Sequence, residues 1–467
     1  MPLQKTLEEH IKKQTQNTQA SQQTTPQYRT TGFYKETTFQ DTPLGKIPRE
    51  WKIVKLKDIC EKIKAGGTPP TSRKEFYNGD IPFVKIEDIT NIRKYLRHTS
   101  TTITKAGLEN SNAWLVPPKS LLFAMYGSIG AVAINDVPVA TNQAILAIVP
   151  DREKSDVEFL YYLLIFLKPY FEKYAKRTTQ ANLTAEIVRE FKIPFPPLQE
   201  QRGIAEILST VDRAIEGVND VVARLERLKK ALMKELLTGR VRVREENGKL
   251  IFHRETEFQE TEIGKIPKGW KLVKFKEASE IRKGKRISGS AKSVAFIPME
   301  AIPDNSLYAK YELRNVDEVK SYVYCEPGDI LLAKITPSFE NGKQGIVPEE
   351  LRGKIVLATT EVYPIKCKNI DKYFLFYLLK YPLIRNKLAS LMRGTTGRKR
   401  VPREALEELL LPHPPITEQR RIAEILLSID RAIELYQEKR LRLKRLKRGL
   451  MDLLLTGRVR VRVERVT

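Results

Sequence analysis

The sequence predicts an α+β protein with two similar mixed α/β domains, separated by two long helices that pair as an antiparallel coiled coil with pseudo-twofold symmetry. Two observations lead to this prediction. Segments at both ends of one half of the chain recur in the other half at a nearly constant offset. The recurring end segments also have the apolar spacing of a long helix, whereas the stretches between them mix short β-like and helical runs.

Three matched segments define the repeat. GKIPREW returns as GKIPKGW, the stretch that begins PPLQEQR matches one that begins PPITEQR at fourteen of twenty positions, and LLTGRVRVR returns letter for letter. The matched pairs are 45–51 with 264–270, 196–215 with 414–433, and 236–244 with 454–462. Because the ends match and the middles diverge, we expect one fold that carries two different recognition surfaces.

These matches divide the chain into seven parts. We expect a partly disordered N-terminal segment, two mixed α/β domains, a helix after each domain, a linker and a tail. Their boundaries are 1–44 (N-terminal segment, with Gln/Thr-rich residues 14–31), 45–195 (first domain), 196–238 (central helix), 239–263 (linker), 264–413 (second domain), 414–457 (distal helix) and 458–467 (tail). Within the domains, 52–56 and 131–134 read as strands, and 159–174 and 373–392 as helices. The alternating Arg and Val residues after each long helix predict a short ribbon, and the alternative is phosphate contact.

Both long helices have heptad spacing. Each begins after a Pro-Pro pair and ends at Thr-Gly, which are suitable start and stop signals. A helix of this length with one apolar stripe needs a partner, and its repeat in the same chain is the obvious one. The predicted seam is Ile204, Ile207, Val211, Val218, Val221, Leu225, Leu228 and Leu232 in the first helix, and Ile422, Ile425, Ile429, Tyr436, Leu443, Leu446 and Leu450 in the second.

The composition favours a polyanionic partner. There are 82 Lys and Arg against 57 Asp and Glu, a formal charge of +25. A surplus of this size suggests nucleic acid, and the alternative is a basic surface that aids solubility. Seven Lys or Arg at 439–448 are either the solvated face of a coiled coil or a contact for phosphate or an acidic partner. Three distant cysteines and no membrane-length apolar run favour a cytoplasmic location without membrane binding.

Small, basic loops are the candidate DNA contacts. Arg, Lys, Thr, Ser, Gln and Asn side chains contact phosphates and base edges, and glycine allows close approach to a duplex. In the first domain the candidates are Lys64, Gly66, Gly67, Thr68, Ser72, Arg73, Lys74, Tyr126, Ser128, Arg177, Thr179, Gln180 and Asn182. In the second they are Arg282, Lys283, Lys285, Arg286, Ser288, Lys334, Thr336, Arg393, Thr395, Thr396, Arg398, Lys399 and Arg400.

Motifs for catalysis are missing. The chain has no G-x-x-x-x-G-K-[ST] phosphate loop and no G-x-G-x-x-G frame, and its four histidines show no metal spacing. We therefore predict a binding protein with no catalytic residue, metal or cofactor of its own.

The pattern resembles the specificity subunit of type I restriction-modification systems. The resemblance rests on the GKIPxxW starts, Gly66-Gly67-Thr68-Pro69 with GDIPFVKI at 79–86, and the PPxxEQRxIAEIL helix starts, and it covers residues 34–462. It implies two target recognition domains that each read half of a bipartite asymmetric site on double-stranded DNA, with adenine as the methylated base. It also implies that the helices set the spacer and dock two methyltransferase subunits. Those subunits would use S-adenosylmethionine, and motor-nuclease subunits would use ATP and Mg²⁺.

Other classes of protein would look different. A fused catalytic fragment would show a catalytic motif, and a regulator would usually show a helix-turn-helix or a ligand domain. A scaffold without DNA binding would leave the charge of +25 and the divergent basic middles unexplained.

Overall fold

The computed structural model describes residues 28–43, 45–175, 182–284, 293–395 and 397–465. The chain forms two compact units, and each unit includes parts of both long helices. The first unit is Met1–Glu216 with Arg442–Thr467, and the second is Gly217–Leu441. The units therefore differ from the contiguous succession of parts expected from the repeat, because the end of each long helix packs in the unit where the other one begins.

The first unit is built on a five-stranded sheet in the order β5-β12-β9-β10-β7, beside a three-stranded sheet in the order β11-β6-β8. The strands are β5 (Cys60–Ala65), β12 (Ile145–Pro150), β9 (Leu121–Ala124), β10 (Val132–Asn135), β7 (Tyr95–Leu96), β11 (Ala140–Thr141), β6 (Tyr77–Val84) and β8 (Thr101–Ile103). Three further strands are β2 (Phe39–Thr42), paired with β3 (Gly45–Pro48), and β4 (Lys52–Lys55), paired with β13 (Lys192–Phe195).

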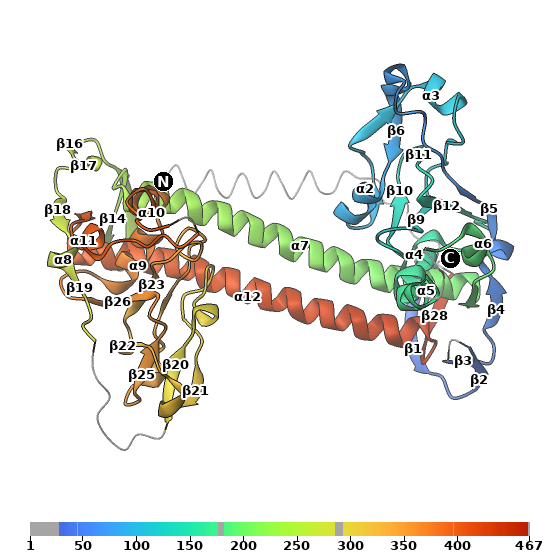
Figure 1. The fold of residues 1–467 in the computed structure, drawn as a ribbon. Coiled ribbons are helices and arrows are strands. Elements are labelled where there is room, and N and C mark those ends of the chain that lie inside the picture. Colours follow the sequence, from blue (N-terminus) through green and yellow to red (C-terminus); the bar gives the residue numbers. More distant parts are fainter. Residues whose placement is uncertain (1–27, 44, 176–181, 285–292, 396, 466–467) are drawn as a thin grey trace. The chain divides into compact units, whose positions relative to one another are not determined.

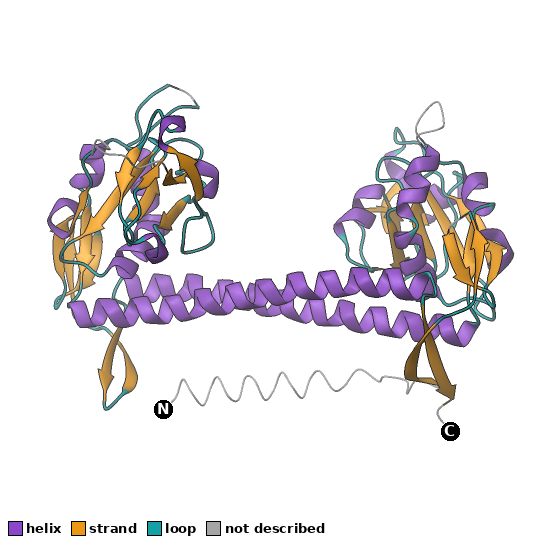
Figure 2. Cartoon of the chain, turned by 90° about the horizontal axis from the view of Figure 1, so that it is seen from below, coloured by secondary structure: helices purple, strands orange, loops and turns teal. Residues whose placement is uncertain are grey.

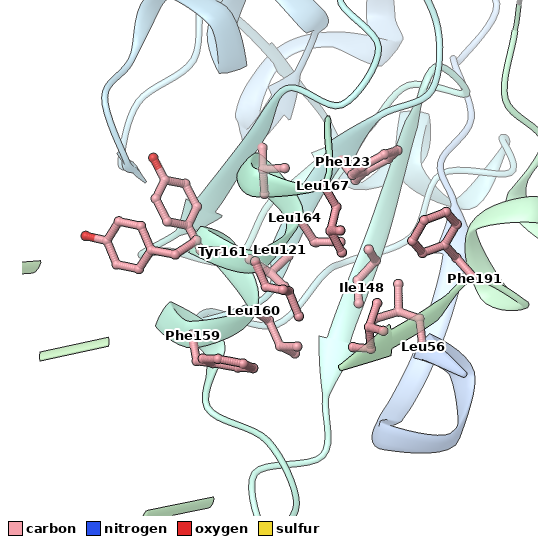
Figure 3. Packing of buried hydrophobic residues seen from close by; sticks show 14 of the residues in the cluster. Leu56, Leu121, Phe123, Ile148, Phe159, Leu160, Tyr161, Leu164, Leu167 and Phe191 are labelled. Carbon is pink, nitrogen blue, oxygen red and sulfur yellow. The ribbon is translucent and has the colours of Figure 1, made fainter. Parts of the chain in front are cut away.

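Two helices cover the five-stranded sheet, α4 (Val157–Phe166) and α5 (Lys168–Ala175). Leu160 and Leu164 of α4 lie in one buried cluster with Leu121 and Ile148 of the sheet (Figure 3). The sequence predicted one helix here and the structure has two. Pro169 explains the break, because proline has no N–H for the helical hydrogen bond.

The second unit repeats this scaffold. Its sheets have the orders β19-β26-β23-β24 and β21-β20-β25-β22, followed by α9 and α10. The elements are β19 (Ser279–Ile281), β26 (Val362–Cys367), β23 (Ile330–Ala333), β24 (Gln344–Ile346), β21 (Glu312–Asn315), β20 (Ser293–Ile297), β25 (Val356–Ala358), β22 (Val323–Cys325), α9 (Lys372–Lys380) and α10 (Pro382–Ser390). Paired strands β16 (Phe258–Thr261) with β17 (Gly264–Pro267), and β18 (Lys271–Lys274) with β27 (Leu410–His413), match their counterparts in the first unit. Pro382 at the start of α10 splits the predicted helix 373–392.

The two long helices are α7 (Leu198–Leu237) and α12 (Ile416–Leu455), and they lie side by side within each unit (Figures 1 and 2). In the second unit Lys229 of α7 bonds to Asp430 of α12, while Arg440 of α12 bonds to Asn219. Because residue numbers rise along one helix as they fall along the other, the pairing is antiparallel. This confirms the predicted pairing.

The seam of the pair differs from the predicted one at two positions. Leu228 is 48% exposed and Leu446 is 51% exposed, so neither belongs to it. Leu208 and Val222 of α7, each one residue after a predicted seam position, are buried. The reason is that each helix also packs on its own domain, since Leu208 joins the core of the first unit. A helix that must bury a stripe against two neighbours widens it beyond a strict heptad seam.

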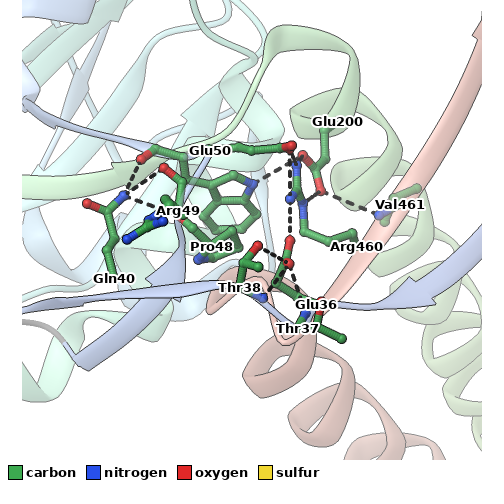
Figure 4. Close-up of polar contacts among 11 residues, drawn as sticks. Glu36, Thr37, Thr38, Gln40, Pro48, Arg49, Glu50, Glu200, Arg460 and Val461 are labelled. Atoms are coloured by element: carbon green, nitrogen blue, oxygen red, sulfur yellow. Dashed lines mark hydrogen bonds and ion pairs between the residues drawn. The ribbon is translucent and has the colours of Figure 1, made fainter.

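A buried cluster of charges ties the segments of the first unit together (Figure 4). Arg460 donates to both carboxylate oxygens of Glu200 at 2.7 and 2.9 Å, and to Glu36 at 2.7 Å. The indole N–H of Trp51 donates to Glu200 at 3.2 Å. All four residues are buried. We call this cluster the first clasp, because it joins the start of α7, the strand after α12 and the GKIPxxW motif.

The second unit contains an equivalent cluster, the second clasp. Arg242 donates to both oxygens of Glu418 at 2.7 and 2.8 Å and to Glu255 at 2.7 Å, and Trp270 donates to Glu418 at 3.1 Å. The repeated motifs of the sequence therefore meet in space: each Glu comes from a helix start, each Arg from the strand after the other helix, and each Trp from a GKIPxxW segment.

The glycines that end the helices complete each clasp. Gly239 and Gly457 have φ of +70° and +68°, which glycine adopts without strain. A Cβ on Gly457 would lie 2.3 Å from Pro48 Cγ, and one on Gly239 would lie 2.4 Å from Pro267 Cγ. The Thr-Gly stop is thus required both by the backbone turn and by close packing on the GKIPxxW proline.

Each long helix is followed by a strand, as the Arg-Val alternation predicted. β14 (Val241–Glu246) forms a hairpin with β15 (Lys249–Arg254), within the expected linker. β28 (Val459–Arg465) pairs with β1 (Tyr28–Lys35), so most of the expected tail and part of the expected N-terminal segment form one ribbon. Residues 28–31, expected to be disordered, belong to that ribbon, and residues 1–27 lie outside the described residues.

We expect Arg460→Met to lower the free energy of unfolding of the first unit by about 3–5 kcal/mol, because it leaves two buried carboxylates without their cation. Arg462→Met is the matched control, since Arg462 is exposed on the same strand and should contribute less than about 1 kcal/mol. Denaturant unfolding measures both, and equal losses would contradict the role of the clasp.

Candidate nucleic-acid interface

In the first unit the predicted loops meet at one end of the five-stranded sheet. β5, β12 and β9 are antiparallel neighbours, so the end of β5, the start of β12 and the end of β9 share an edge. The loops 66–74 and 126–128 leave from this edge. The amide of Leu183 donates to the carbonyl of Met125 at 3.2 Å, which brings the neighbouring Asn182 to the same place.

The second unit places its loops at the equivalent edge. β19, β26 and β23 are also antiparallel neighbours, and the segments that begin at Arg282 and Lys334 leave where β26 begins. The loop 393–400 joins them, because Ile335 forms a bridge with Arg400 and the Thr336 amide donates to the Lys399 carbonyl at 2.9 Å. Each unit thus gathers the predicted segments at one sheet edge, which we call its reading edge.

The predicted DNA-contact residues differ in how far their side chains are exposed to solvent. In the first unit Tyr126, Ser128 and Asn182 are half-buried, and the exposed ones are Lys64, Thr68, Ser72, Arg73 and Lys74. In the second unit the exposed ones are Lys283, Arg393, Thr395, Arg398, Lys399 and Arg400. Arg177, Thr179, Gln180, Lys285, Arg286, Ser288 and Thr396 lie outside the described residues.

Packing inside the domain accounts for two of the glycines that were predicted as DNA contacts. Gly66 and Gly67 are buried, and an added Cβ would lie 1.9 Å from the Thr141 carbonyl oxygen or 2.7 Å from Asn112. They are needed because loop 66–74 packs against backbone inside the domain. This packing explains the glycine pair without an approach to a duplex.

Arg282 is likewise held inside its own domain. Its guanidinium bonds to the buried carboxylate of Asp329 and lies 2.6 Å from Glu326. Two carboxylates offset its charge, so its role as a free phosphate contact is not supported. Thr336 donates to Glu340 at 2.7 Å, and burial lowers the pKa of Lys334. These side chains fix the reading edge of the second unit.

Sequence reasoning missed Gln143 and Glu361, which occupy equivalent places. Each is the second residue after an Ala-Thr pair, at 140–141 and 358–359, and each precedes a strand at the reading edge. The shared Ala-Thr pair is the sequence signal that could have identified Gln143 and Glu361. Exposed Gln143 accepts a hydrogen bond from Thr68 at 2.5 Å. Glu361 instead accepts two from Arg400, at 2.9 and 2.8 Å, which hold the pKa of its carboxyl below the usual range.

The two reading edges therefore differ in chemistry while they share a scaffold. One presents a neutral amide and hydroxyl, and the other an ion pair among basic residues. Amide and guanidinium groups pair with different base edges. The arrangement suits two unlike recognition surfaces.

Cysteine and metal chemistry find little support. Burial raises the pKa of both Cys60 and Cys367 to about 12, which leaves little thiolate at neutral pH. In the part of the chain that the structure describes, no group of three or more His, Cys, Asp or Glu is placed to hold a metal ion. None of the described helices has an apolar stretch long enough to cross a membrane.

Comparison with known proteins agrees with the duplicated architecture. The type I restriction modification DNA specificity domain matches residues 48–227 and again 267–445. The chain is 29% identical over 459 residues to the putative type I restriction enzyme MjaX specificity subunit of Methanocaldococcus jannaschii, covering 92% of this chain and 98% of that protein. It is 28% identical over 441 residues to the MjaVIII specificity subunit of the same organism, with the same coverage. The crystal structure of a type I restriction-modification S subunit from M. genitalium shares the fold, with a TM-score of 0.52 at 16% identity, covering 90% of this chain and 99% of that one. This chain therefore belongs to the family of type I restriction-modification specificity subunits.

Proposed function

We propose that this chain is the non-catalytic subunit that selects the DNA site of a type I restriction-modification complex. Each unit would read one half of a bipartite, asymmetric site with its reading edge. The observation that carries this proposal is that the two edges share a scaffold but differ in chemistry, Gln143 with Thr68 against Glu361 with Arg400. The formal charge of +25 supports a polyanionic partner.

The helices would also dock two methyltransferase subunits, with motor-nuclease subunits in the full complex. Leu435 and Leu441 of α12 are 65% and 53% exposed, which leaves apolar side chains available to a protein partner. S-adenosylmethionine, ATP and Mg²⁺ would be bound by those partners. A cytoplasmic location fits this assignment.

The same helices would set the spacer between the half-sites. Each is a continuous 40-residue helix that starts in one unit and ends in the other. A helix of that length spans about 60 Å and resists bending better than a loop would.

Mapping methylated adenines in the host genome with and without this gene tests the proposal. One bipartite motif should disappear when the gene is deleted. If every methylated motif persists, the chain does not select a methylation site.

We expect Lys74→Ala to weaken binding of the reconstituted methyltransferase complex to all duplexes alike and to reduce the slope of log K against log salt by about 1, the effect of losing one phosphate contact. Lys154→Ala is the matched control, because Lys154 follows β12 at the opposite end of the sheet. Filter binding from low to high salt measures the slope of log K against log salt for both variants. An unchanged slope for Lys74→Ala would contradict a phosphate contact.

Gln143→Ala should relax the base preference in one half-site only, because the amide is fixed at one reading edge. The expected loss of discrimination is about 1–3 kcal/mol at one position. Glu361→Gln should affect only the other half-site, by releasing Arg400. The sequence motifs that each variant complex methylates in a plasmid library show which half-site has changed. A variant that altered both half-sites would argue against separate readers.

Inserting seven residues in both α7 and α12 should lengthen the recognised spacer by about 3 base pairs, because each residue adds ~1.5 Å and each base pair ~3.4 Å. The half-site sequences should stay the same. Motif mapping checks this, and an unchanged spacer in an active complex would refute the ruler.

A further inference from the structure

In both units a tyrosine of the recognition domain, an aspartate of one long helix and a lysine of the other helix meet. In the first unit the Tyr162 hydroxyl donates to Asp212 at 2.7 Å, and the Lys447 ammonium lies 2.7 Å from the same carboxylate. In the second unit Tyr377 donates to Asp430 at 2.6 Å, and Lys229 lies 2.6 Å from it. We call these two groups the triads.

The triads are largely sheltered from water. Both tyrosines are fully buried, and the aspartates and lysines are half-buried. Burial raises the pKa of both tyrosines well above the ordinary range, so the hydroxyl keeps its proton and can donate. Each lysine also lies over the tyrosine ring, 5.1 Å from the centroid for Lys447 and 5.4 Å for Lys229.

The contacts next to the triads differ between the units. The first unit adds a partly buried ion pair, in which Lys94 bonds to Glu158 at 2.8 Å. Lys94 also donates to Ser209 at 2.9 Å and to the Tyr162 hydroxyl at 3.2 Å. The residue equivalent to Glu158, one before the matching Phe-Leu pair, is Tyr373, which bonds to Tyr308. The domains have thus diverged around the triads while keeping the same three side chains and the same bonds among them.

We propose that the triads position the recognition domains: each fixes the orientation of its domain on the helix pair and so makes the complex select one spacer length. This inference rests on the proposed function. Apolar packing of a domain on helices tolerates small rotations because it has no direction. Hydrogen bonds to a carboxylate are directional and, with a charged partner, stronger than neutral ones. An aspartate held from two sides couples the domain to both helices at once.

The double variant Tyr162→Phe with Tyr377→Phe removes the hydroxyls and keeps the rings. The experiment uses the reconstituted methyltransferase complex and duplexes that carry both half-sites with the cognate spacer or one base pair more or less. We expect the preference for the cognate spacer to fall roughly five- to thirtyfold, the value of about one hydrogen bond in one or in both units, with the half-site bases unchanged. Lys447→Arg with Lys229→Arg keeps the charges and should retain the preference.

Tyr161→Phe is the matched control. Tyr161 neighbours Tyr162 on α4 and is buried, but its hydroxyl donates to the Arg93 carbonyl at 2.7 Å inside the domain. Tyr161→Phe should therefore leave spacer preference unchanged, and thermal melting of both variants shows whether they fold alike.

The inference is overturned if the double variant keeps the wild-type spacer preference, or if it weakens binding to all spacers equally, as a merely structural role would. If the unaltered complex showed no preference for two half-sites, the proposed function itself would fail instead.

Discussion

The pairing of one arginine with one buried glutamate in each unit is the interaction on which the fold depends. Arg460 lies 260 residues from Glu200 and 424 residues from Glu36 in the sequence, so the first clasp joins positions near both ends of the chain. A buried guanidinium is tolerated only with its charge offset and its donors satisfied, which Glu200 and Glu36 achieve together. The clasp therefore requires three distant segments to be present at once, and the repeated motifs are the parts of it.

The clasps also explain why the ends of the two repeats match while the middles diverge. Each clasp needs a Trp from a GKIPxxW segment, a Glu from a helix start, a Gly at a helix end and an Arg three residues after that Gly. A change in one of them leaves a buried charge or a steric overlap in the others. Gln143 and Glu361 at the reading edges are not part of a clasp and differ between the units, while the sheets that support them pair in the same way.

The sequence was sufficient for the architecture because the repeats and the apolar spacing are local signals. The two long helices, their antiparallel pairing and their Thr-Gly ends were predictable in this way. The exact seam was not, because Leu208 is buried by the recognition domain as well as by the other helix. Arg282 and Gly66 looked like free loop residues because their partners, Asp329 and Thr141, lie 47 and 75 residues away in the sequence. Composition marks a basic loop, but only contacts decide which of its charges are already paired.

The division of each helix between two units has a consequence for how the domains can diverge. The first unit takes the start of α7 and the end of α12, and the second takes the remainder. A recognition domain therefore packs on a surface made by both helices. A change in the apolar stripe of one helix alters its contact with the other helix as well as its contact with the domain. The reading edges differ in chemistry, while the bonds of the triads to the helices, such as that of Tyr162 to Asp212, are the same in both units. Two different surfaces can thus be carried on one constant frame.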